Sequence, residues 1–275
     1  MNTPVNVSPL PSVPPSSTPP RASRGPLAAA VLLLVILGSG GAYLLRASRT
    51  QAPAPAPVPE QAAAPVPSAP AQPTVQLSGT DPRVRDLLRG LSSDADFLRW
   101  LSAEDLVRRV TATTNLVAEG QSPRLPLSFM TPNGDFRAAK RSGRTVMAPE
   151  SYARYDGVAR AVASVDAKAA QRVYQELKPL LDAAHAEIAP TGRSLEQSLA
   201  QAIGRLTRVE VPRGPVELTP KGALYAYADP RLEALGAAEK HLLRMGPENM
   251  RKVQAKLSEL SAALGLPSPE QARQP

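Results

Sequence analysis

The sequence contains no cysteine and only two histidines among its 275 residues. Without cysteine there is no disulfide, no thiolate metal site and no lipid-modified cysteine, so a lipoprotein is excluded. Neither His185 nor His241 has a second histidine at metal-ligand spacing, so we expect no zinc hydrolase, no metal and no cofactor. A Ser-His-Asp triad built from distant residues stays open, beside the simpler interpretation of packed or surface histidines.

Glycine-rich phosphate loops, dinucleotide fingerprints and nucleophile-elbow spacings are also missing from the region after the apolar run described below. Aromatic residues make up 4% of the chain and hydrophobic residues 43%, which indicates a core of Leu, Val and Ala and favours packed helices. The net charge of +8 is too small to predict nucleic-acid binding. The sequence assigns no catalytic residue and favours a protein that is not an enzyme.

The longest apolar run, Leu27–Leu45, contains no charged residue. As a helix rising about 1.5 Å per residue, it spans roughly the 30 Å hydrocarbon core of a bilayer, and we interpret it as a transmembrane helix in contact with lipid. One alternative is a signal peptide cleaved after the small residues Ser39 to Gly41, and another is a buried core helix.

A segment rich in proline and alanine, Ala52–Pro73, follows the apolar run. Such a segment favours extended polyproline II structure, which at about 3.1 Å per residue reaches up to about 70 Å. Arginines flank the apolar run about equally, so charge alone does not fix its orientation. A stiff spacer suits a domain held away from a bilayer. We therefore expect a single-pass protein of the inner (cytoplasmic) membrane of a bacterium, with its carboxy-terminal domain outside the cytoplasm.

The fold class predicted is mainly α: a multi-helix globular domain with a small β-hairpin element, after a single transmembrane helix and a Pro/Ala-rich linker. The expected parts are a disordered cytoplasmic tail (1–25), the transmembrane helix (26–45), the linker (46–79), the helical domain (80–266) and a disordered tail (267–275).

Within the domain, local signals predict where several elements begin and end. Ser102 with Asp105, and Ser194 with Gln197, have the spacing of capping boxes, and Pro179 predicts a break or kink. Turn residues between 122 and 147 predict irregular structure with a hairpin. Short strands are expected at 209–211 and 223–228, followed by helices at 236–245 and 247–264.

A series of short motifs in a fixed order resembles the bacterial domain-of-unknown-function 3014 family. The motifs are Asp105–Arg109, Gly120–Arg124, Ser151–Asp156, Gly214–Leu218, Ala228–Pro230 and Leu242–Pro247. The resemblance covers roughly residues 81–266 and implies a similar layout of anchor, Pro-rich stretch and domain. It implies no activity, so no functional residue is carried over.

Two clusters are candidate ligand-binding sites. The first is Tyr152, Arg154, Tyr155 and Asp156, in which Tyr152 and Asp156 share a helix face and can bind one ligand group together. The alternative is a helix start whose tyrosines pack in the core. The second is Arg137, Lys140, Arg141 and Arg144, the densest basic stretch, which can hold anionic lipid headgroups or an acidic wall polymer. The alternative is a solvated loop.

Three functions compete at this stage. The first is a membrane-anchored envelope protein whose domain binds or scaffolds a partner protein. The second is an envelope hydrolase using a carboxylate pair such as Glu104 with Asp156, which requires a cleft between the two acids. The third is a module that binds anionic surfaces. The oligomeric state is not predicted.

Overall fold

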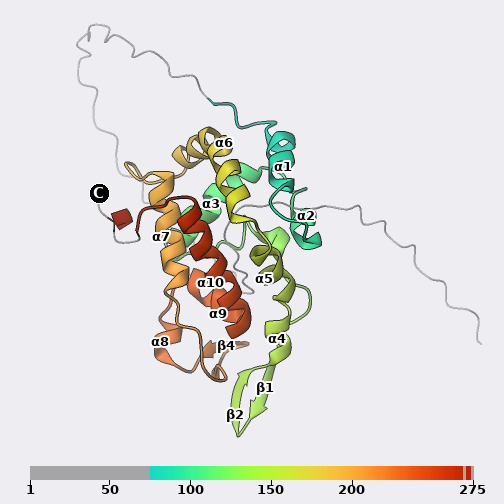
Figure 1. The fold of residues 1–275 in the computed structure, drawn as a ribbon. Helices are drawn as coiled ribbons and strands as arrows, with labels where there is room; N and C mark the ends of the chain where they lie inside the picture. Colours follow the sequence, from blue (N-terminus) through green and yellow to red (C-terminus); the bar gives the residue numbers. More distant parts are fainter. Residues whose placement is uncertain (1–74, 269–270, 274–275) are drawn as a thin grey trace, which may run out of the picture.

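The computed structural model describes residues 75–268 and 271–273, and these form a mainly helical body with two small antiparallel hairpins (Figure 1). The predicted tail, transmembrane helix and most of the linker lie outside the described residues. Within the described part of the chain, no helix is long and apolar enough to cross a membrane. The helices are α1 (Asp81–Arg89), α2 (Ala95–Trp100), α3 (Leu106–Ala118), α4 (Pro149–Ala153), α5 (Asp156–Ala163), α6 (Ala167–Ala186), α7 (Leu195–Thr207), α8 (Pro230–Glu233), α9 (Ala237–Arg244) and α10 (Gly246–Ala263).

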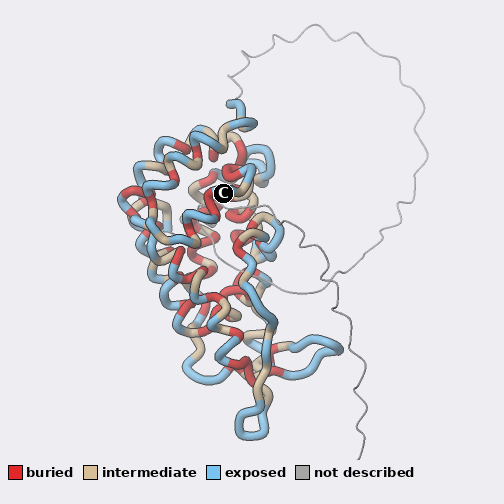
Figure 2. Tube along the Cα trace, turned by 90° about the vertical axis from the view of Figure 1, so that its right-hand side faces the viewer, coloured by how far each residue is buried: buried red, intermediate tan, exposed pale blue. Residues whose placement is uncertain are grey.

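The core lies where α3, α6, α7 and α10 pack together, and α5 covers another side of α10. Helix α10 shows why: Met250, Val253 and Leu257 recur at intervals of three and four residues, so they share one face, and each is almost completely buried. The other face of α10 carries exposed Arg251 and Lys252. Figure 2 shows the same division throughout the body, with buried residues inside and exposed residues along the outer turns and the hairpins.

The two hairpins form the end of the molecule that lies lowest in Figure 1. Strands β1 (Ala138–Arg141) and β2 (Arg144–Met147) pair around a turn in which Ser142 and Gly143 both have positive φ, 50° and 78°, as a tight two-residue hairpin requires. Strands β3 (Leu218–Lys221) and β4 (Leu224–Tyr227) form the second antiparallel pair.

The segment that connects α7 to β3, residues 208–217, also joins the two hairpins and is called the joining segment. Val146 of β2 forms a bridge with Glu217, and the Met147 amide donates to the Val216 carbonyl oxygen at 3.0 Å. The Ala228 amide, just after β4, donates to the Glu217 carbonyl oxygen at 2.9 Å. The segment before β3 therefore lies between the hairpins and positions them relative to each other.

Several local predictions are confirmed and others are wrong. The capping box of Ser194 and Gln197 begins α7, and α10 ends before Gly265. The strand predicted at 209–211 is wrong, because the partner of β4 is 218–221. Helix α6 continues through Pro179 without a break, since buried Leu177 and Leu181 hold the turns on both sides.

The start of α3 also differs from the prediction. Asp105 has a left-handed backbone, with φ 56°, and its side chain caps no amide. The cap comes instead from Asp81 on α1, whose carboxylate oxygens accept from the amides of Asp105 at 2.7 Å and Leu106 at 3.0 Å. A carboxylate at a helix start accepts hydrogen bonds from the free amides, and its negative charge interacts favourably with the helix dipole.

Candidate functional site

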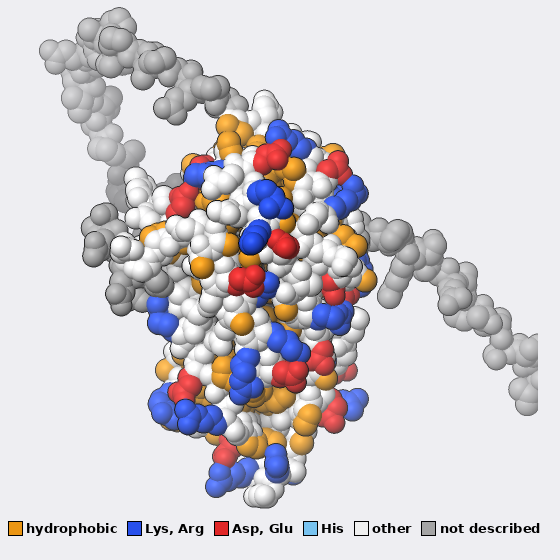
Figure 3. All heavy atoms as spheres, in the orientation of Figure 1, with side chains coloured by type: hydrophobic (Ala, Val, Ile, Leu, Met, Phe, Trp, Pro, Cys, Tyr) orange, Lys and Arg blue, Asp and Glu red, His pale blue; other side chains and the backbone are white. Residues whose placement is uncertain are grey.

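A basic groove lies between the first hairpin, the segment before β3 and the start of α10. Its volume is about 630 Å³. Four cationic side chains line it: Lys140 and Arg141 from β1, Arg213 from the joining segment and Arg251 from α10. No carboxylate is among its lining residues in the described chain. Figure 3 shows Lys and Arg side chains at this lower end of the molecule and also higher on the same face.

Most cations of the groove form no hydrogen bond or ion pair within the described residues. Lys140 Nζ donates to Thr145 Oγ1 at 2.8 Å across the hairpin. Among residues 75–268 and 271–273, Arg141, Arg213 and Arg251 form no side-chain hydrogen bond or ion pair, and all three are exposed. Exposed cations attract anions at a distance, so the groove has a positive potential available to a ligand, although Glu248 reduces it near Arg251.

The floor of the groove is apolar and rigid. Val146 and Met147 of β2 are buried beneath it. Four prolines complete its walls: Pro149, Pro212, Pro215 and Pro247. Proline fixes its own φ, so little conformational entropy is lost when a ligand settles on such walls.

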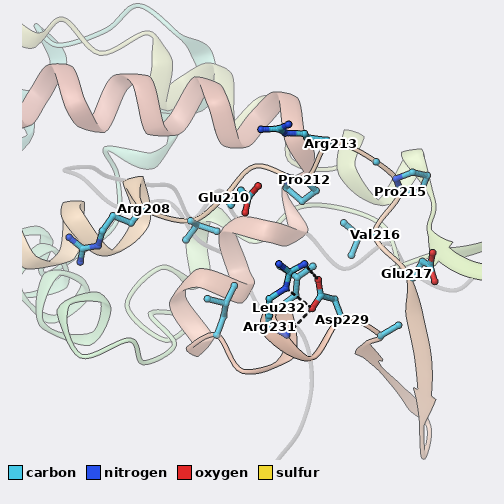
Figure 4. Close-up of a pocket in the computed structure, with 14 residues that line it drawn as sticks. Arg208, Glu210, Pro212, Arg213, Pro215, Val216, Glu217, Asp229, Arg231 and Leu232 are labelled. Carbon is cyan, nitrogen blue, oxygen red and sulfur yellow. Dashed lines mark hydrogen bonds and ion pairs between the residues drawn. The ribbon is translucent and has the colours of Figure 1, made fainter.

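A second hollow lies on the other side of the joining segment and has a volume of about 730 Å³ (Figure 4). Its charges are of both signs, and two of its three acids are paired: Arg231 Nη2 binds Asp229 Oδ2 at 3.0 Å, and Glu217 binds Arg144. The Arg231 guanidinium keeps the pKa of the Asp229 carboxyl below its usual value. Arg213 points away from the Asp229–Arg231 pair, towards the long helix above it (Figure 4). The basic groove is therefore the better candidate for a ligand.

The structure divides the predicted basic stretch. Lys140 and Arg141 line the groove, whereas Arg144 does not line it and is paired with Glu217. Arg137 lies outside the groove, and its backbone amide and carbonyl oxygen bind the Ser151 hydroxyl at 2.7 and 2.8 Å. Sequence reasoning did not select Arg213, because a single arginine in a Pro-Gly turn gives no signal of its own.

The predicted cluster at 152–156 does not surround one ligand. Tyr152 lines the basic groove and packs against Gly246, and Tyr155 is buried in the core. Asp156 Oδ1 accepts from Asn249 Nδ2 at 2.8 Å, so this carboxylate ties α5 to α10. Arg154 lines a separate hollow beside α2. Tyr152 and Asp156 therefore contribute to packing, and a shared ligand site at this cluster stays a prediction.

Tyrosine burial makes the fold sensitive to alkaline pH. Burial raises the pKa of Tyr152 and of Tyr227 to about 12, and it also raises the pKa of Tyr155 and of Tyr174. A raised folded-state pKa stabilises the fold fully below the unfolded value of about 10, and this stabilisation is lost as the pH rises towards 12.

We therefore expect the free energy of unfolding to fall by about 3 kcal/mol between pH 10 and pH 12, allowing for partial exposure of Tyr152. Urea unfolding at a series of pH values measures this fall. Tyr227→Phe removes a buried hydroxyl and should reduce the fall, whereas Tyr225→Phe, at an exposed position, serves as the control. A constant stability over this range would contradict the prediction.

The histidines have structural partners. The Arg244 guanidinium, which can only donate, lies 3.0 Å from His241 Nδ1, so a neutral His241 carries its proton on Nε2. That Nε2 lies 2.7 Å from Ser122 Oγ and donates to it, so it is not arranged to take the serine proton. His185 is buried and its Nε2 binds Ser198 Oγ at 2.9 Å, and burial lowers the pKa of His185. No cluster of metal-ligating side chains occurs within the described residues.

The hydrolase hypothesis gains no support from this geometry. Glu104 and Asp156 line neither the basic groove nor the second hollow, and Asp156 is bound to Asn249. A carboxylate pair acts across a substrate cleft with one acid shielded from water, but Glu104 and Asp156 are both exposed.

Comparison with known proteins gives a match to a family model. A family model described as "Protein of unknown function (DUF3014)" matches residues 106–261, which is more than half of the chain. The family resemblance suggested by the sequence motifs is confirmed. No curated protein and no solved structure matches the chain. The match extends from α3 into α10 and includes all four cations of the basic groove.

Proposed function

Because the chain belongs to the DUF3014 family of unknown function, its role has to be inferred from its own geometry, and we propose that it is a membrane-tethered binding protein whose basic groove holds an anionic polymer of the bacterial envelope. The observation that carries this proposal is the set of four cations without a carboxylate at one concave site. Phosphate or carboxylate groups repeated along a polymer match such a set.

The position of the groove favours a polymer as its ligand, rather than the surface of the bilayer that would hold the anchor. The described chain begins beside α1, at the end of the body opposite the hairpins (Figure 1). A tether from a membrane would therefore enter at one end, and the groove would face outwards at the other. This argument rests on the interpretation of Leu27–Leu45 as an uncleaved anchor.

The proposed location is the inner membrane, with the helical domain outside the cytoplasm. Reporter fusions at the carboxy terminus test the orientation. An activity that requires export is expected from the fusion, and a reporter active only in the cytosol would contradict the proposed topology.

Charge reversal in the groove tests the binding function. The full-length chain, held in neutral phosphatidylcholine nanodiscs, is titrated with inorganic polyphosphate. Reversing Arg213 and Arg251 together to Glu should weaken binding at least about tenfold, since a cation near an anionic surface contributes about 1 kcal/mol. Lys168→Glu, at an exposed lysine on α6, is the control, and it matches in net charge each single groove reversal, Arg213→Glu or Arg251→Glu.

Three results would distinguish the possibilities. Binding that weakens as salt rises and that is lost only in the groove variant supports the proposal. Equal loss in the Lys168 control would indicate attraction by net charge alone and would contradict it. Binding to vesicles containing phosphatidylglycerol but not to polyphosphate would assign the groove to lipid headgroups instead.

A further inference from the structure

A smaller hollow, separate from the basic groove, lies between α2, the segment 129–133 and the α4–α5 joint. Its volume is about 230 Å³. Polar groups make up most of its lining surface, and a smaller apolar part comes from Trp100, Phe129, Met130, Pro132 and Val158. Its polar side chains are Asp96, Arg99, Thr131, Asn133 and Arg154. A hollow of this size and lining suits a compact ligand with one polar end.

The only acid that lines this hollow is already neutralised. Asp96 binds Arg99 Nη2 at 2.5 Å and Arg160 Nη2 at 2.6 Å. Arg160 Nε also binds Asp94 Oδ2 at 2.8 Å, and the Arg160 guanidinium helps to hold the pKa of the Asp94 carboxyl below its usual value despite partial burial. Both acids of this network are therefore occupied by Arg99 and Arg160.

Arg154 is the cation of this hollow that has no acidic partner among the described residues. No hydrogen bond or ion pair to its guanidinium is formed by any residue that the structure describes, and its Nε is buried without a partner. Its one close contact is with the Tyr155 ring, whose centroid lies 5.6 Å from Cζ. Since Nε is shielded, the two terminal nitrogens are the donors available to a ligand. A buried donor without a partner destabilises a fold, so this arrangement calls for a further explanation.

We infer that this hollow binds a carboxylate that carries a small apolar group. A single unpaired guanidinium balances one negative charge, and its planar fork matches the two oxygens of a carboxylate. A phosphate dianion would leave excess negative charge near Asp96. The aromatic and aliphatic wall accommodates the apolar group. The ligand is either a free small acid or the carboxyl end of a peptide, and both present the same chemistry.

The chain contains a single tryptophan, and it lines this hollow, so its fluorescence reports occupancy directly. The full-length chain in detergent is titrated with N-acetylalanine, with the tripeptide Gly-Gly-Ala, and with the carboxamide of each. We expect a saturable change with a free acid and none with the corresponding amide. A response to both acids assigns the site to the carboxylate alone, and a response to the tripeptide only assigns it to a chain end.

The variant Arg154→Gln should abolish the response or weaken it at least tenfold, while Arg172→Gln, on the exposed face of α6, should leave it unchanged. Because Arg154 forms no hydrogen bond or ion pair within the described part of the chain and contacts only the Tyr155 ring, its replacement should change the melting temperature little, which keeps the test interpretable. Arg154→Lys retains the charge without the fork and should recover only part of the binding. No response to either acid, or an equal response in Arg154→Gln, would overturn the inference.

Discussion

Gly246→Ala should destabilise the domain by about 3 kcal/mol or more, because two separate effects act at this residue. Gly246 has φ 80°, which is unfavourable for any residue with a Cβ atom. A Cβ at this position would also lie 2.5 Å from Tyr152 Cγ and 2.6 Å from Cδ1. Rotation of the ring would not relieve this contact, since Tyr152 Cβ would also lie 2.8 Å from the added atom. Urea unfolding of the variant measures the loss.

Gly265→Ala is the matched control for this prediction. Gly265 also has a positive φ, 62°, but no atom lies within 4 Å of where its Cβ would be. Its replacement should therefore show only the backbone effect, about 1 kcal/mol. The difference between the two variants isolates the contact with Tyr152. If Gly246→Ala lost no more stability than Gly265→Ala, the close packing of Tyr152 would be disproved.

The same joint explains why two of the family motifs occur together. The motif Ser151–Asp156 and the motif Leu242–Pro247 are distant in sequence, yet Tyr152 rests on Gly246. Asn249 strengthens the joint, because its Nδ2 lies near Asp156 Oδ1 and near the carbonyl oxygens of Tyr152 and Met245, at 2.8 to 3.3 Å. These two segments therefore maintain packing between α4, α5 and α10.

Local sequence signals predicted much of the helical fold because the energies behind them are local. The Ser194–Gln197 capping box is complete within one turn of helix. The buried face of α10 follows from the spacing of Met250, Val253 and Leu257 in one segment. In both cases the residues that determine the element lie within it.

The remaining features depend on contacts between distant segments. The cap of α3 comes from Asp81, 25 residues before Leu106, and not from the predicted capping box of Ser102 and Asp105. The groove joins Lys140, Arg213 and Arg251, which belong to three separate elements. Periodicity and motif spacing within one segment carry no information about which distant segments come into contact. The sequence could therefore indicate Lys140 and Arg141 as candidates but could not place them beside the other two cations.

A buried ion pair between α7 and α9 gives the second large prediction. Arg205 Nη1 binds Glu239 Oε1 at 2.8 Å, and Arg205 Nε donates to the Ala118 carbonyl oxygen at 3.2 Å. The Glu239 side chain is 8% exposed and that of Arg205 31%. This pair fastens the end of α3 to both helices. Gly236 leaves room for it, since a Cβ there would lie 2.5 Å from Glu239 Oε2.

Glu239→Ala should lower the free energy of unfolding by about 3 kcal/mol, because it leaves a mostly buried guanidinium without its counter-ion. The double variant Arg205→Ala with Glu239→Ala should lose less than the sum of the two single variants, since the unpaired charge is then absent. Glu176→Ala removes the partner of Arg83 in an exposed pair, where the loss should be at most about 0.5 kcal/mol. Urea unfolding of the four variants measures these differences, and strict additivity at Arg205 and Glu239 would show that the pair does not act as a unit.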